Sequence, residues 1–118
     1  MMDFTLTEAQ VQLREEIRKV CRGYSDSYWR EVDAKGEYPE AFVRKLTELG
    51  WLAALIPEEY GGIGLGITEA SVILEEINRW GGNATACHAQ MYTMGTVLRH
   101  GNEEQKRRYL PGVASGEI

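Results

Sequence analysis

Apolar side chains recur at helical spacing along most of this chain, whereas the alternation typical of β-strands is almost absent. The clearest stretch opens with Thr7 and Gln10, a pair typical of a capping box, and continues with Leu13, Ile17 and Val20 on one helical face. Glycines and prolines separate the successive stretches. The pattern predicts an all-α bundle of about five to six helices, forming a single domain over residues 1–118.

The start and stop signals of each stretch bound the predicted helices. We expect helices over residues 7–22, 25–35, 39–49, 68–80, 83–100 and 102–110. Thr68, Asn83 and Asn102 are the predicted N-caps of the last three helices. The apolar run 51–56 is predicted to be buried and extended, and Pro57 opens a glycine-rich loop.

Charge and hydropathy exclude several classes of protein. The chain has 13 basic and 18 acidic side chains, a formal net charge of −5 and a pI of about 5.1. This balance has the wrong sign for general binding to nucleic acid or to an anionic membrane. No run approaches the roughly 18 to 20 apolar residues of a spanning helix, and residues 1–5 lack the pattern of a signal peptide. We therefore expect a cytoplasmic protein that binds neither nucleic acid nor membrane.

The residues most often used in catalysis and metal binding are sparse. Cys21 and Cys87 lie far apart without a CxxC pair, so both are interpreted as reduced, buried thiols. His88 and His100 have no acidic residue at the ligand spacing of a helix-bundle metal site. No nucleophile and base stand out as a pair. We expect neither a metal site nor a catalytic residue in this chain.

The run from Gly61 to Thr68 resembles a phosphate-binding loop in the spacing of its glycines. Ile67, however, stands where the lysine of a Walker loop would meet the phosphates, and no convincing strand precedes the run. A dinucleotide fingerprint fails at the same residue, because its third glycine is missing. We interpret the run as a close-packed loop that enters a helix.

The fifth predicted helix carries a polar row beside an apolar stripe. Thr85, His88 and Tyr92 fall in one row by the i, i+3, i+4 rule, next to a stripe that contains Met91 and Met94. Such a row can line a pocket. The alternative is that His88 only forms a hydrogen bond to a neighbouring helix.

Several segments together resemble one family, the N-terminal region of the acyl-CoA dehydrogenases. They follow the family pattern in order and spacing over nearly all of the chain. The segments are FTLTEAQ at 4–10, YPEAF at 38–42, LTELGW at 46–51, IPEEYGG at 56–62, LEEI at 74–77, GNEEQKRRYLP at 101–111 and ASGE at 114–117.

The resemblance implies an enzyme that also contains a middle β domain and a C-terminal helical domain, both absent from this chain. Enzymes of this family use FAD to remove two hydrogens from the α and β carbons of an acyl-CoA thioester, with a glutamate base from the C-terminal part. This chain alone is then expected to bind no cofactor and to be catalytically silent. Electron-transfer flavoprotein is the expected acceptor, and a homo-oligomer is the expected assembly.

The resemblance also assigns part of the wall of the acyl-binding pocket to the fifth helix. By position, Thr85, His88 and Tyr92 would face the acyl-CoA substrate, with Met91 and Met94 as neighbours. Some members have an acidic or a small residue near the place of His88. His88 departs from this pattern, which makes a polar or branched acyl group conceivable.

Two alternatives remain open. The chain could be a stand-alone helical interaction or assembly module derived from this family, or the same domain of an acyl-CoA oxidase or a flavin monooxygenase. A truncated domain would also expose side chains that other domains normally cover. We therefore expect Met91, Met94 and Trp80 to be exposed and the isolated chain to self-associate.

Overall fold

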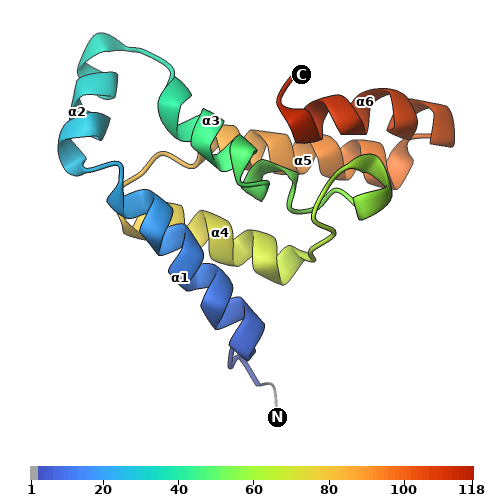
Figure 1. Ribbon diagram of the computed structural model, residues 1–118, viewed down its shortest axis with the longest axis horizontal. Coiled ribbons are helices and arrows are strands. Elements are labelled where there is room, and N and C mark those ends of the chain that lie inside the picture. The colour runs from blue at the N-terminus through green and yellow to red at the C-terminus, as the bar shows by residue number, and fades with distance from the viewer. Residues whose placement is uncertain (1–2) are drawn as a thin grey trace.

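The computed structural model describes residues 3–118, and within them every regular element is a helix (Figure 1). Met1 and Met2, which entered the expectation about the N-terminal stretch, lie outside the described residues. The elements are α1 (Glu8–Arg22), α2 (Asp26–Lys35), α3 (Glu40–Glu48), the 3-10 helices η1 (Trp51–Ala53) and η2 (Glu58–Tyr60), α4 (Ile67–Arg79), α5 (Thr85–His100) and α6 (Glu103–Ser115). The predicted all-α fold is confirmed.

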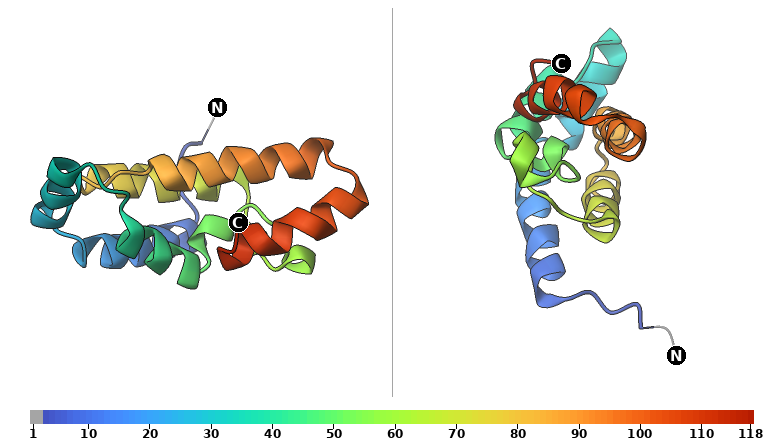
Figure 2. Two further views of the ribbon diagram at one scale, coloured as in Figure 1. Left: turned by 90° about the horizontal axis from the view of Figure 1, so that it is seen from above. Right: turned by 90° about the vertical axis from the view of Figure 1, so that its right-hand side faces the viewer.

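The helices form a plate two layers thick. Figure 2 shows α4 and α5 in one layer and α1, α3 and α6 in the other, with α2 at one edge. The plate measures 43 × 42 × 20 Å, and its radius of gyration is 14.9 Å, against about 13.5 Å for a compact domain of this length. Its accessible surface is 7590 Å², against about 6,450 Å² for a rounded monomer of this mass. The flat shape therefore leaves an unusually large surface exposed.

Both predicted capping boxes are present and fix the starts of α1 and α6. The Thr7 hydroxyl accepts the N–H of Gln10 at 3.2 Å, and the Gln10 side chain accepts the N–H of Thr7 at 2.9 Å. Asn102 and Gln105 make the same reciprocal pair, with both distances 2.9 Å. These bonds satisfy N–H groups that a helix start otherwise leaves without a partner.

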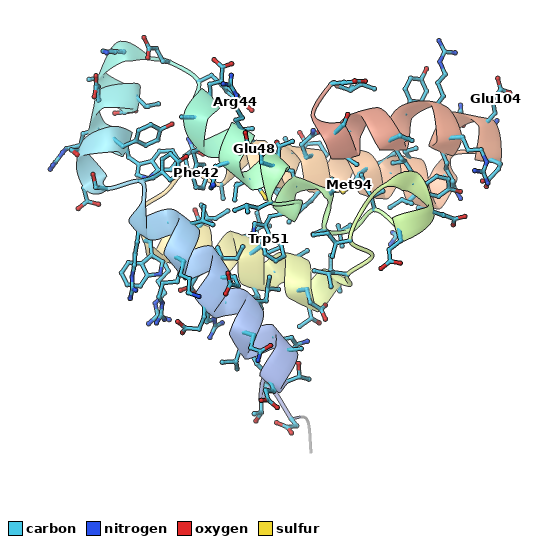
Figure 3. The ribbon with its side chains drawn as sticks, viewed as in Figure 1. Phe42, Arg44, Glu48, Trp51, Met94 and Glu104 are labelled. Atoms are coloured by element: carbon cyan, nitrogen blue, oxygen red, sulfur yellow. The ribbon has the colours of Figure 1, made fainter. Side chains whose placement is uncertain are left out.

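The buried apolar side chains of the described residues form two clusters. The larger joins α1, α3 and α4 with the first turns of α5, and Ile17, Phe42 and Ile73 are almost fully buried in it. The smaller joins η1, η2 and the later part of α5 with α6, around Met94. Figure 3 shows Phe42 and Met94 in the interior, whereas Glu104 lies at the periphery.

Aromatic rings attach α2 to the larger cluster. None of the side chains of α2 is fully buried, but Trp29 and Phe42 meet edge to face with ring centroids 4.9 Å apart. Tyr24, just before α2, meets Phe42 in the same way at 5.2 Å. Such pairs add to the stabilisation that burial of the rings provides. A short helix with little buried surface is thereby held at the edge of the plate.

Met91 and Met94 belong to the core rather than to an exposed stripe. Their side chains are 5% and 0% exposed, so the expectation that both would be exposed is wrong. The reason is that Met91 packs into the larger cluster, while η1 and α6 cover Met94. Trp80 is 39% exposed, as expected. Other large apolar side chains that are exposed are Phe4, Val11, Tyr38, Leu49, Ile67, Tyr92, Tyr109 and Ile118.

Residues 51–56 are largely buried, as predicted, but they are not extended. Gly50 has φ 84°, a left-handed conformation that turns the chain sharply after α3. The N–H of Ala53 then donates to the carbonyl of Gly50 at 3.0 Å, and the N–H of Ile56 donates to that of Ala53 at 3.1 Å. A short apolar run fits a buried helical turn as well as a strand, and these local bonds decide between the two.

Two of the predicted N-caps, Thr68 and Asn83, are not the N-caps of their helices. Helix α4 begins at Ile67 with Gly66 as its N-cap, because the N–H of Ala70 donates to the carbonyl of Gly66 at 3.1 Å. Thr68 therefore lies in the first turn and is not the cap. Helix α5 begins at Thr85, whose N–H donates to the Asn83 side chain at 2.9 Å. Asn83 satisfies the start of α5 from just outside the helix.

Helix α6 continues through Pro111 to Ser115, beyond the predicted end near Leu110. Pro111 has no N–H for the carbonyl one turn earlier, which normally disfavours a helix interior. Leu110 and Val113 are nevertheless 0% and 6% exposed, so burial on both sides of the proline outweighs the lost bond. Gly116, at φ 85°, ends the helix.

The glycine-rich loop is closed by its own backbone. Consecutive N–H groups of residues 62–65 donate to carbonyls of residues 53–57 at 2.7 to 3.2 Å. A Cβ on Gly62 would lie 2.0 Å from the carbonyl oxygen of Ile56, so only glycine fits this approach. The loop therefore presents no row of free amides to a phosphate, in line with its interpretation as a close-packed entry to α4.

Within residues 3–118, no helix combines the length and the apolar character that crossing a lipid bilayer requires.

Candidate functional site

The outer face of α5 carries the polar row predicted from the sequence. Thr85, His88 and Tyr92 are all exposed, and they follow one another along a single face of the helix. The rings of His88 and Tyr92 meet edge to face, with centroids 5.3 Å apart and an interplanar angle of 76°. The structure therefore brings these three predicted residues together, and we call them the α5 row.

Met91, the fourth predicted site residue, points in a different direction. It is 5% exposed and packs in the larger core cluster together with Cys87. Its position on the helix lies closer to the buried stripe than to the row. Met91 therefore supports α5 from the core side and does not contribute to the exposed surface of the row.

The polar side-chain groups of the α5 row are not used within the fold. Among residues 3–118, the Thr85 hydroxyl, the His88 imidazole and the Tyr92 hydroxyl form no hydrogen bond to another protein group. The alternative in which His88 only bonds a neighbouring helix is thus not realised in this structure. Each group remains able to bond to solvent or to a ligand.

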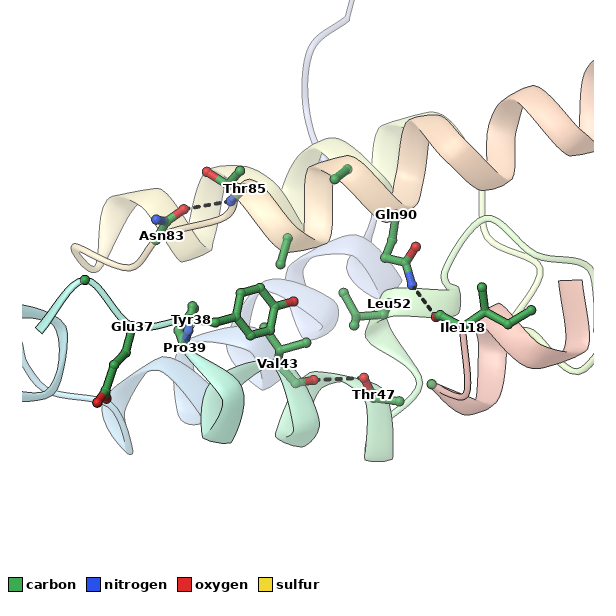
Figure 4. Close-up of a pocket in the computed structure, with 14 residues that line it drawn as sticks. Glu37, Tyr38, Pro39, Val43, Thr47, Leu52, Asn83, Thr85, Gln90 and Ile118 are labelled. Carbon is green, nitrogen blue, oxygen red and sulfur yellow. Dashed lines mark hydrogen bonds between the residues drawn. The ribbon is translucent and has the colours of Figure 1, made fainter. Parts of the chain in front are cut away.

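Two hollows flank the row, and Thr85 contributes to both. The smaller, of about 220 Å³, lies between α4 and the start of α5. The larger, of about 840 Å³, lies between α3 and α5 and reaches the last residues of the chain (Figure 4). The residues of the smaller hollow are Leu74, Asn78, Asn83, Ala84, Thr85 and His88.

The larger hollow was not predicted from the sequence. Leu52 lines it together with Ala86 and Ala89, whose small side chains leave space beside α5. Figure 4 shows the Gln90 amide directed at Ile118, where its Nε2 donates to the backbone carbonyl at 3.4 Å. The other residues that line it are Gly36, Glu37, Tyr38, Pro39, Val43, Thr47, Asn83, Thr85 and Gly116.

A second polar cluster lies between α1 and α4, and sequence reasoning missed it. Glu76 is 0% exposed, and its carboxylate lies 3.5 Å from the Nε atoms of both Arg14 and Arg18. The indole Nε1 of Trp80 donates to the same carboxylate at 2.8 Å. Arg18 also lies over the Trp80 ring, 5.4 Å from its centroid. We call these four residues the Glu76 cluster. Because it pairs arginines of α1 with a carboxylate of α4, the cluster is suited to hold these two helices together.

A signal for the Glu76 cluster is present in the sequence. Glu76 directly precedes Ile77 and follows Ile73 by three residues, so it lies on the apolar face of its helix. Arg14 and Arg18 are one turn apart on another helix, where both can reach a single anion. A carboxylate at a core position with a matched pair of arginines elsewhere is typical of a buried ion cluster.

The thiols of Cys21 and Cys87 are buried and are expected to be unreactive near neutral pH. Burial raises the pKa of the Cys87 thiol to about 12. Burial, and secondarily the charge of Glu76, raises the pKa of Cys21 to about 11. Neither thiol forms the thiolate that a nucleophile requires near neutral pH. Across residues 3–118 no three His, Cys, Asp or Glu side chains are grouped to hold a metal ion.

This chain is similar in sequence to known proteins. A family model described as "Acyl-CoA dehydrogenase, N-terminal domain" matches residues 7–117. The chain is 35% identical over 117 residues to the mitochondrial isovaleryl-CoA dehydrogenase of Bos taurus, covering 95% of this chain and 27% of that protein. It is 34% identical over 123 residues to the glutaryl-CoA dehydrogenase of Desulfococcus multivorans, covering 99% of this chain and 31% of that protein.

A solved structure agrees with the sequence relatives. The complex of a glutaryl-coenzyme A dehydrogenase with glutaryl-CoA matches with a TM-score of 0.82 and 32% identity, over 99% of this chain and 31% of that one. The fold is thus that of an N-terminal helical domain of an acyl-CoA dehydrogenase. This chain belongs to the acyl-CoA dehydrogenase family. It spans less than a third of the length of the relatives described here.

Proposed function

We propose that this chain forms one wall of the acyl-binding pocket in an FAD-dependent acyl-CoA dehydrogenase. The parent enzyme would oxidise the α and β carbons of an acyl-CoA thioester, and this chain alone would contribute no catalytic residue. The observation that carries the proposal is the α5 row. A chain that matches the family domain over residues 7–117 presents Thr85, His88 and Tyr92 together on one exposed helix face.

The shape of the plate supports a role as one part of a larger protein. Its surface exceeds that of a rounded monomer by roughly 1,100 Å², which is comparable to the area each partner buries in a stable protein interface. We propose that residues 1–118 are a single helical domain, with a β domain and a C-terminal helical domain in the parent protein. These domains would cover part of the exposed surface and close the pocket beside α5.

We propose that the described residues do not hold the flavin by themselves. The amides of the glycine-rich loop are already bonded to the backbone of residues 53–57. Neither hollow beside α5 is lined by an arginine or a lysine that could pair with a pyrophosphate. We therefore assign FAD, and the glutamate base, to other parts of the parent enzyme. The contribution of this chain is to contact the acyl group and to exclude water from it.

The wider setting of the parent enzyme is also a proposal. Resemblance to the family favours electron-transfer flavoprotein as the electron acceptor and a homo-oligomer as the assembly. We propose a cytoplasmic protein, although the isovaleryl-CoA dehydrogenase of Bos taurus is named as mitochondrial, so the family does not determine the compartment. The names of the relatives also differ in their acyl groups, isovaleryl in one and glutaryl in the other. Family membership therefore leaves the acyl substrate open.

The proposal is tested by measuring the intact mass of the natural gene product together with its absorbance spectrum. We expect a protein that contains flavin and whose mass is much greater than 13.3 kDa. Its flavin absorbance should fall when acyl-CoA is added without oxygen. Free CoA serves as the control and should leave the spectrum unchanged. A colourless product of about 13 kDa would contradict the proposal and favour the stand-alone interaction module. Rapid reoxidation by oxygen would instead favour an oxidase or a monooxygenase.

A further inference from the structure

We propose that the α5 row selects acyl groups that carry an uncharged oxygen substituent, a hydroxyl or a keto group, on the part of the chain that lies against α5. This inference rests on the proposed function, because it assigns a substrate class to the same pocket wall. It adds that Thr85, His88 and Tyr92 determine specificity by hydrogen bonding and not only by shape.

The chemistry of the three side chains supports this class of substrate. A threonine hydroxyl and a tyrosine hydroxyl can each donate and accept, and a neutral imidazole offers one donor and one acceptor. None of these groups is bonded to another protein group among residues 3–118. A substrate oxygen could therefore bond to the row without displacing any bond of the fold.

The row is long enough to follow an acyl chain. Thr85 and Tyr92 are seven residues apart on α5, which corresponds to about 10 Å along the helix axis. His88 lies between them, and its imidazole contacts the Tyr92 ring edge to face. Polar groups are thus available at three levels along the wall.

A plain hydrocarbon chain is a poor match for such a wall. When the pocket closes, it would remove water from the three polar groups and provide no replacement bond. Unpaired polar groups are costly, and sites that bond a substrate oxygen discriminate strongly against the analogue that lacks it. The row therefore disfavours the unsubstituted chain as much as it favours the substituted one.

The surrounding charges favour a neutral oxygen over a carboxylate. The hollow that His88 lines contains no lysine, arginine, aspartate or glutamate. Of the residues that line the larger hollow beside Thr85, Glu37 is the one with a charged side chain, and its charge is negative. A substrate carboxylate would lose its hydration without gaining a permanent cationic partner. A hydroxyl or keto group carries no such penalty.

The test uses the full-length protein that contains this domain. We would measure kcat/KM, and dissociation constants by calorimetry, for acyl-CoA substrates of equal length with and without a hydroxyl or keto group toward the distal end. We expect a preference of about tenfold or more for the substituted chains, the equivalent of one hydrogen bond. Thr85→Val, His88→Leu and Tyr92→Phe should each reduce that preference, mainly by improving the binding of the plain chain. Thr93→Val, an exposed change on α5 outside the row, is the matched control.

The outcomes separate the inference from the function on which it rests. If both kinds of acyl-CoA are oxidised but the plain chain is equally good, or the row variants leave the ratio unchanged, selection by the row is wrong and the proposed function stands. If a terminal carboxylate is preferred over both, the inference is likewise overturned. If no acyl-CoA binds or reduces the protein, the proposed function fails and the inference fails with it.

Discussion

The Glu76 cluster and the α5 row are two polar groups of similar size that the fold treats in opposite ways. The carboxylate of Glu76 is 0% exposed and is surrounded by Arg14, Arg18 and Trp80. The α5 row is exposed, and its polar groups have no partner within residues 3–118. The charged groups of the Glu76 cluster are paired with one another between α1 and α4, whereas the polar groups of the α5 row are available to bind another molecule. Of the two sets, the α5 row is therefore the better candidate for contact with a ligand.

The position of each group in the plate explains the difference. Glu76 faces α1 across the interior, where a charge must have partners to be tolerated. Thr85 and His88 face outward, where water satisfies them at little cost. The following predictions test this contrast, beginning with the change of largest effect.

Replacing Ile77 by aspartate should unfold the domain. Ile77 is 0% exposed and next to Glu76 in sequence. Arg14 and Arg18, however, pair with the side chain of residue 76 and not with that of residue 77. An unpaired buried carboxylate costs several kcal/mol, which is comparable to the whole stability of a small domain. Circular dichroism and urea unfolding would measure the effect, with Ser71→Asp as the exposed control on the same helix. A cooperative, native-like melt of Ile77→Asp would show that the core is misplaced.

Replacing Glu76 by alanine should destabilise the protein by about 3 kcal/mol, because two arginines lose the carboxylate that pairs with their charges and the Trp80 indole loses its hydrogen-bond acceptor. The arginine side chains are 25% and 23% exposed, so solvent limits the loss. Glu75→Ala, at a side chain 63% exposed, should cost less than about 0.5 kcal/mol. Glu76→Gln should fall between them, since it keeps an acceptor for Trp80. If Glu76→Ala and Glu75→Ala had equal urea midpoints, the Glu76 cluster would not stabilise the fold as a buried ion cluster.

Alkaline pH should destabilise the folded protein through its buried thiols. The pKa of Cys87 is raised from 9.0 to about 12, so its contribution is fully present below about pH 9. Between pH 9 and 12 the unfolded chain releases a thiol proton that the folded chain retains, so stability falls as pH rises. The wild type should lose about 1 kcal/mol more than Cys87→Ala between pH 8.5 and 10, measured by urea unfolding.

Thiol labelling sharpens the same contrast between neighbouring positions. Cys87 and His88 are adjacent on α5 and point about 100° apart around the helix axis, so that one is buried and the other exposed. At pH 8, iodoacetamide should label the thiol introduced by His88→Cys much faster than Cys87 in the folded protein. Mass spectrometry would follow the two labelling rates. Similar rates at positions 87 and 88 would mean that this face of α5 is not oriented as described.

Changes in the α5 row should have the smallest effect on stability. Thr85→Val, His88→Ala and Tyr92→Phe remove polar groups that no other part of residues 3–118 uses. Each should shift stability by less than about 0.5 kcal/mol in thermal unfolding. A loss above about 1.5 kcal/mol for any of them would indicate a structural role and remove the contrast with the Glu76 cluster.

Prediction from sequence succeeded where local chemistry decides the structure. The capping pairs Thr7–Gln10 and Asn102–Gln105 are both present, and the α5 row shares one face as the 3.6-residue period requires. It failed where burial across the chain outweighs a local rule. Pro111 does not end α6, because the residues on both sides of it are buried.

The site was only partly predictable for a related reason. The spacing of Thr85, His88 and Tyr92 fixes which residues share a face, but the hollow between α3 and α5 depends on how two distant segments pack. The exposure of methionines was also assigned wrongly. Met91 and Met94 were expected at a surface that η1, α6 and the larger cluster in fact occupy.

The thinness of the plate also affects how the protein opens locally. The plate extends only 20 Å along its shortest axis, and within residues 3–118 each layer is one helix deep, without a third layer to shield it. Opening of any one helix therefore admits water directly to the core. Amide hydrogens throughout the plate should exchange over a narrow range of rates, instead of showing one strongly protected centre. A molecule bound along α5 should then slow exchange in that layer first.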